Sequence, residues 1–182
     1  CIVLGPSHAG PAMRWSLLEA GAYRTPRGDV PIDEGCAEAL RSRCPFLEPD
    51  AWAQRGEHAI EVLVPFLQLL GPHDLTLVPI IVGSDDPVEF HQLGVALAQA
   101  IRMQEEPVLL VASSDLSHYA PRARVVLEDQ GLVEAICALD GARLAHEVSH
   151  GSARMCGAGA VVSVLTAARA LGAGCGTLVQ YG

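Results

Sequence analysis

Short continuous apolar runs alternate along the chain with longer segments in which apolar residues recur every three or four positions. The short runs predict β-strands of a sheet covered on both faces. They lie at Ile2–Gly5, Leu75–Val82, Pro107–Ala112 and Thr177–Gln180. The longer segments predict amphipathic helices. These cover Glu34–Arg43, His58–Leu70, Pro87–Arg102, 124–138, 141–149 and Ala158–Leu171.

Several residues mark where these helices begin, bend or end. Asp33 and Asp86 precede two of them and are typical N-caps. Pro65 interrupts the segment 58–70 and predicts a distortion there. Gly172 ends the last helix. Residues 10–32 fit neither pattern, and we expect a loop with short extended pieces.

Alternating strands and helices indicate an α/β fold, a three-layer α/β/α sandwich with a largely parallel sheet. The 182 residues suit a single domain spanning 1–182, without linker, repeat or low-complexity stretch. The chain begins with Cys1 inside one strand-like run and stops just after another. We therefore expect a domain that is truncated at both ends.

Composition removes several classes of function. The chain has 21 acidic and 12 basic residues and a net charge of −9, which argues against nucleic-acid and anionic-membrane partners. No apolar run approaches the ~20 residues of a membrane span. The six cysteines form no CxxC pair, so zinc ribbons and thioredoxin-type centres are excluded. We expect no signal peptide and no disulfide framework. We expect a protein of the reducing cytoplasm.

Two histidines directly follow predicted strands. His8 follows the first strand, and His118 follows the third, at the end of the segment SSDLSH (113–118). The carboxyl ends of parallel strands meet at one edge of a sheet, where α/β proteins build their sites. Either histidine alone is more simply a loop residue, but the two together favour a functional site.

Two further groups carry candidate chemistry. His58 and Glu61 lie three residues apart on one helical face, which also fits a solvated helix start. Cys156 opens the last helix, where the helix dipole favours a thiolate that can act as nucleophile or metal ligand. The alternative for Cys156 is a small buried hydrophobe, which fits the other five cysteines.

The segment His146-Glu147-Val148-Ser149-His150 matches the HExxH signature of zinc peptidases. Zinc in such enzymes needs a third protein ligand, usually downstream. No His, Asp or Glu follows His150. We interpret the match as a coincidence on a surface helix and expect no metal at His146 or His150.

Taken together, six segments in order along nearly the whole chain resemble the Memo family. They are GPSH (5–8), TPRGDVPID (25–33), GEHAIEVLVPFL (56–67), VPIIVG (78–83), ASSDLSHY (112–119) and MCGAGA (155–160). Bacterial and archaeal members of that family are called AmmeMemoRadiSam system protein B. The resemblance implies a fold similar to class III extradiol ring-cleaving dioxygenases.

The resemblance also implies a site. In the extradiol enzymes two histidines and a carboxylate hold Fe(II), and another histidine acts as acid and base. His8 and His58 match the two metal histidines, Cys156 the position that replaces the carboxylate, and His118 the catalytic histidine, with Asp115 beside it to orient it. The expected cofactor is a divalent metal, iron first, with zinc or copper as alternatives. The family's system name implies AmmeR-type and radical-SAM proteins as partners.

Two functions remain open at this point. One is a metal-dependent redox enzyme related to extradiol dioxygenases, acting on a small or peptidyl aromatic substrate; His118 favours it. The other is a scaffold that binds a small molecule or peptide, without turnover, in a vestigial form of the metal-binding cleft. Cys156 favours the second, because a thiolate is softer than a carboxylate and is easily oxidised.

Overall fold

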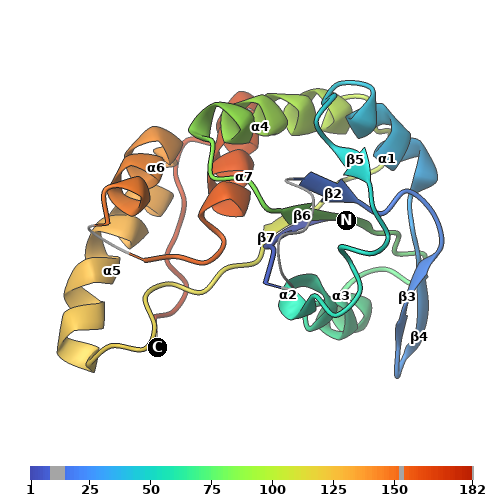
Figure 1. Ribbon diagram of the computed structural model, residues 1–182. Coiled ribbons are helices and arrows are strands. Elements are labelled where there is room, and N and C mark those ends of the chain that lie inside the picture. The colour runs from blue at the N-terminus through green and yellow to red at the C-terminus, as the bar shows by residue number, and fades with distance from the viewer. Residues whose placement is uncertain (9–14, 152–153, 182) are drawn as a thin grey trace.

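The computed structural model describes residues 1–8, 15–151 and 154–181. Its centre is a five-stranded sheet in the order β5-β2-β6-β1-β7 (Figure 1). The strands are β1 (Ile2–Pro6), β2 (Trp15–Leu17), β5 (Glu48–Pro49), β6 (Val78–Val82) and β7 (Leu110–Ala112). β6, β1 and β7 are parallel, whereas β2 is antiparallel to β6 and pairs in parallel with β5. The sheet is therefore largely parallel, as predicted.

Helices cover both faces of this sheet (Figure 1). One face carries α1 (Glu34–Arg41), α4 (Pro87–Ile101) and α7 (Ala158–Ala170). Farther out, α6 (Gly141–Ser149) packs beside α7, and α5 (Arg122–Cys137) packs beside α6. The other face carries α2 (His58–Glu61) and α3 (Val64–Leu70). Ile2 and Leu4 of β1 point into the larger core, and Val3 points into the smaller one. This alternation confirms the predicted three-layer α/β/α sandwich.

The described part of residues 10–32 holds short extended pieces, as expected. Besides β2, it forms a hairpin of β3 (Ala22–Thr25) and β4 (Gly28–Pro31). Pro65 marks a division of the predicted helix 58–70 into α2 and α3, and it lies in the first turn of α3. A proline is tolerated there because its missing N–H has no partner at a helix start.

The predicted strand Thr177–Gln180 is wrong. Residues 173–181 form no strand and run along α5, where the Gly176 N–H donates to the carbonyl of Cys137 at 2.7 Å. The Tyr181 hydroxyl donates to buried Asp129 at 2.7 Å, while Val179 is 95% exposed. An apolar run forms a strand only beside a strand edge that takes its hydrogen bonds, and none of the described strands pairs with this segment.

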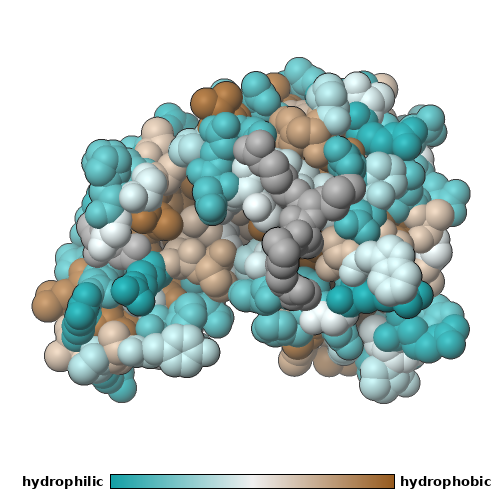
Figure 2. Space-filling view, viewed as in Figure 1, coloured by the Kyte–Doolittle hydropathy of each residue, from teal (hydrophilic) through white to brown (hydrophobic). Residues whose placement is uncertain are grey.

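The surface is mixed in polarity. Figure 2 shows hydrophilic side chains over most of the face in view, interrupted by separate apolar patches. Within the described ranges, no helix combines the length and the apolar character that a membrane crossing requires.

Candidate metal centre

The end of β1 passes unusually close to the start of α2. A Cβ on Gly5 would lie 3.0 Å from the Cβ of Ala59 and 3.1 Å from a side-chain carbon of Ile60. Glycine at this position therefore lets the strand lie directly against the first turn of the helix. As a result, His8, two residues beyond β1, comes beside His58, the first residue of α2.

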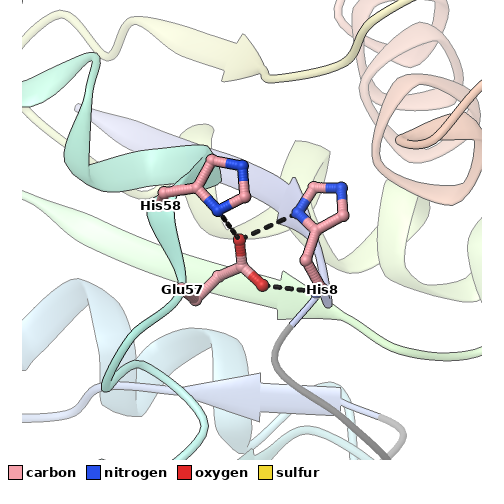
Figure 3. Close-up of side chains that lie close together, drawn as sticks. All are labelled: His8, Glu57 and His58. Carbon is pink, nitrogen blue, oxygen red and sulfur yellow. Dashed lines mark hydrogen bonds and ion pairs between the residues drawn. The ribbon is translucent and has the colours of Figure 1, made fainter. Parts of the chain in front are cut away.

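Glu57 joins the two histidines. It is the N-cap of α2, and its Oε1 accepts the N–H of Ala59 at 3.0 Å. The same oxygen lies 3.0 Å from Nδ1 of His8 and 3.5 Å from Nδ1 of His58 (Figure 3). The other oxygen accepts the backbone N–H of His8. The glutamate itself is only 2% exposed, so one buried carboxylate holds both the main chain and the ring of His8.

These contacts keep the carboxylate charged. Burial raises the pKa of Glu57, but the N–H groups of His8 and Ala59 and the His8 ring outweigh that effect, so its pKa lies below the usual range. The two imidazole rings stack with their centroids 4.8 Å apart and their planes at 25°. The site therefore carries one negative charge between two aligned imidazoles.

This arrangement fits a transition-metal ion. Donor atoms of His8, Glu57 and His58 all lie within 4.8 Å of one another, and they form the one such group of three among the described residues. Imidazole nitrogen and carboxylate oxygen suit iron, zinc and copper alike. Both histidine side chains are partly open to solvent, so an ion and a further ligand can reach them.

Cys156 is linked to this cluster through the loop that follows β7. Its sulfur accepts the Asp115 N–H at 3.1 Å, and the Gly157 N–H donates to Ser114 Oγ at 2.9 Å. The same loop reaches α2, because Ser113 Oγ donates to the carbonyl of Ala59 at 2.7 Å. The cysteine is therefore tied to the His58 helix through the loop that follows β7.

A cavity of about 590 Å³ adjoins the carboxyl ends of β1 and β6. Ser7, which precedes His8, and Cys156 both line it, together with Phe90 and Val148 from α4 and α6. The start of the last helix thus faces the same space as the end of the first strand. The predicted role of Cys156 as the third ligand stays a prediction, since the clustered donor group consists of His8, Glu57 and His58.

His118 lies on the loop between β7 and α5. It is exposed, and its Nδ1 lies 2.9 Å from the carbonyl of Leu116, the partner that sets its orientation. Asp115 uses its backbone N–H toward Cys156. Asp129 of α5 anchors the loop by accepting the Ser117 N–H at 3.0 Å. The predicted catalytic roles of His118 and Asp115 remain predictions.

The HExxH segment ends α6, with His150 as the residue that caps the helix, and its Val148 and Ser149 line the same cavity as Cys156. The rings of His146 and His150 approach to 4.0 Å between centroids. Glu147, however, is held by Arg143, whose Nε donates to its carboxylate at 2.7 Å. The glutamate is therefore paired with a guanidinium one turn back along its own helix, which disfavours the role of a peptidase base.

Glu57 is the functional candidate that sequence reasoning missed. The helical spacing drew attention to Glu61, but that residue is exposed and stands outside the cluster. The signal that was available is the position of Glu57 directly before His58 at a helix start. An N-cap carboxylate points back over the first turn, where a neighbouring histidine can meet it.

Comparison with known proteins identifies the family of this chain. The model of the family described as Memo-like protein matches residues 1–182. A MEMO1 family protein of Methanopyrus kandleri is 33% identical over 180 residues, which is 99% of this chain and 64% of that protein. Relatives from Methanococcoides burtonii and Methanocaldococcus jannaschii are each 33% identical, over 67% and 63% of their own lengths. The chain thus spans about two thirds of the length of these relatives.

Proposed function

The chain belongs to the Memo-like protein family, and we propose that it is a metal-dependent redox enzyme whose ion is held by His8, His58 and Cys156. The observation that carries the proposal is the pairing of two stacked histidines on one buried carboxylate at the carboxyl end of the sheet. In this proposal Cys156, which lines the same cavity as Ser7, is the third ligand.

In this proposal each site residue has a separate role. The two histidines bind the ion, and the thiolate adds a soft ligand that suits iron, zinc or copper. Bound iron, or copper as an alternative, would supply the redox chemistry, as in the extradiol dioxygenases to which the resemblance of the family points; zinc is redox-inert and would suit a site without redox turnover. His118 moves a proton on the substrate, because an imidazole ring can both donate and accept a proton. The cavity of about 590 Å³ accommodates a small or peptidyl aromatic substrate.

Oxygen consumption tests this function. Reduced, iron-loaded protein should consume oxygen when catechols are added, and His8→Ala should abolish the uptake. The matched control is His73→Ala, because His73 is an exposed histidine outside the donor cluster. Uptake that survives in His8→Ala would contradict the proposal.

A binding cleft without turnover is the second candidate. It is favoured by the thiol of Cys156, which is easily oxidised and stands where a carboxylate would serve a dioxygenase. In that case the metal-loaded protein binds small molecules or peptides in the cavity but consumes no oxygen. Calorimetry with catechols alongside the oxygen electrode separates the two functions.

We also propose a cytoplasmic role beside AmmeR-type and radical-SAM proteins, in the modification pathway that the family's system name implies. Mixing the purified proteins and measuring a shift in elution on gel filtration tests this association. Unchanged elution at micromolar concentrations would contradict it.

A further inference from the structure

We propose that Glu57 is a positioning residue that holds both rings with a proton on Nδ1 and so presents Nε2 of His8 and His58 to the ion. This inference rests on the proposed metal-binding function and names a group that the His/His/Cys set leaves out. The alternative is that Glu57 itself binds the metal together with the two Nδ1 atoms.

The contacts of Glu57 support the first role. Oε1 already receives the Ala59 N–H and the His8 ring at 3.0 Å each, and Oε2 receives the backbone N–H of His8. A metal ion at Oε1 would compete with these donors for a carboxylate that is itself almost closed to water. Since both oxygens of the carboxylate already accept backbone N–H groups, it acts as an acceptor, and a ring nitrogen that bonds to it must carry a proton.

The geometry of the rings completes the argument. Nδ1 of His58 faces the same oxygen at 3.5 Å, which is within ion-pair distance but longer than the hydrogen bond that the His8 ring makes. Figure 3 shows that the second ring nitrogen of each histidine points away from the carboxylate. A neutral imidazole that donates from Nδ1 has its free electron pair on Nε2. Carboxylates orient metal-binding histidines in this way in many proteins, and losing one typically weakens metal binding about 10–100-fold.

The tautomers can be read directly by long-range ¹H–¹⁵N NMR of the metal-free protein, at a pH where the imidazoles are neutral. His8 and His58 should both carry the proton on Nδ1, whereas exposed His73 provides the reference for an unconstrained ring. In Glu57→Ala, His8 and His58 should move to the tautomer of His73. Protons on Nε2 of both rings in the wild-type protein would overturn the proposal.

Zinc loading distinguishes positioning from ligation. If zinc binds through Nε2, both Nδ1 protons persist in the loaded protein; if Glu57 and Nδ1 bind it, both protons disappear and the proposal fails. Zinc affinity should fall about 10–100-fold in Glu57→Ala and remain unchanged in Glu61→Ala, an exposed carboxylate on the same helix.

Glu57→Gln keeps the shape of the side chain and guards against a folding defect in the alanine variant. Because the amide offers one acceptor oxygen in place of two, its zinc affinity should lie between those of the wild type and Glu57→Ala. Wild-type affinity in Glu57→Gln would overturn the positioning role. Failure of the wild type to bind zinc, iron or copper would refute the proposed function, whereas the tautomers of the metal-free protein would still decide the role of Glu57.

Discussion

Two glycine-to-alanine substitutions inside helices should change stability in opposite directions. Alanine is about 1 kcal/mol better than glycine in a helix interior, so propensity alone predicts a gain at both Gly94 and Gly131. At Gly94, in α4, the new Cβ would lie 2.5 Å from the Cβ of Thr166 and 2.7 Å from the carbonyl oxygen of Ser163. Both atoms belong to α7, and a backbone oxygen cannot rotate away, so the two helices must separate.

Overpacking of this kind typically costs about 1–3 kcal/mol. Because several contacts at Gly94 fall below 3.0 Å, we place the cost at the upper end. After the gain in propensity, Gly94→Ala should destabilise the protein by roughly 2 kcal/mol, and the melting temperature should fall by about 4–8 °C. At Gly131 the Cβ meets only the carboxylate of Glu147, at 2.7 Å, which is the far end of a flexible side chain. Gly131→Ala should therefore be neutral or stabilising by up to ~1 kcal/mol.

Urea unfolding of both variants, with the slope m held equal to that of the wild type, measures these changes. A Gly94→Ala variant as stable as the wild type would refute the close approach of α4 and α7. Equal losses in the free energy of unfolding of both variants would show that the contacts between Gly94 and α7 do not cause the loss.

Three further predictions concern the loop and the surface helix. Tyr181→Phe should destabilise the protein at neutral pH, because it removes the hydrogen bond to Asp129. That bond raises the pKa of Tyr181, so its contribution to stability is full below the ordinary tyrosine pKa of ~10 and is lost as the pH rises through the higher pKa of the folded state. Unfolding curves should therefore show a difference in stability between variant and wild type at neutral pH that disappears at strongly alkaline pH. The double variant His146→Ala/His150→Ala should retain its metal; loss of stoichiometric zinc in elemental analysis would restore the peptidase interpretation. His118→Ala should also retain the metal while abolishing any oxygen uptake, and loss of the metal would instead make it a ligand.

The centre of the fold could be predicted because its strands are buried on both faces. β1 and β6 are apolar at every position apart from glycine and proline, which is the pattern of a covered parallel sheet. The strands toward the β5 edge of the sheet were harder to predict from the sequence. β5 is a two-residue strand of Glu48 and Pro49, and β2 carries Ser16 at its centre, so neither shows a strand pattern. Thr177–Gln180 has that pattern but pairs with none of the described strands, because hydrogen-bond partners are set by tertiary structure.

The site was predictable in part for a similar reason. His8 could be placed at the sheet edge because it follows a buried strand, and His58 because it matches a family position. The burial of Glu57 could not be predicted, since a glutamate at a helix start is ordinarily solvated. It becomes buried only because β1 passes against α2 at Gly5 and brings the backbone of His8 onto the carboxylate.

Metal content is the most direct test of the central claim that His8 and His58 hold an ion. Protein purified without oxygen or chelators should contain close to one iron, zinc or copper ion per chain by elemental analysis. His8→Ala and His58→Ala should each lose it, whereas His73→Ala should keep it. Equal metal content in all four proteins would contradict the account, as would a wild-type protein that binds neither iron, zinc nor copper.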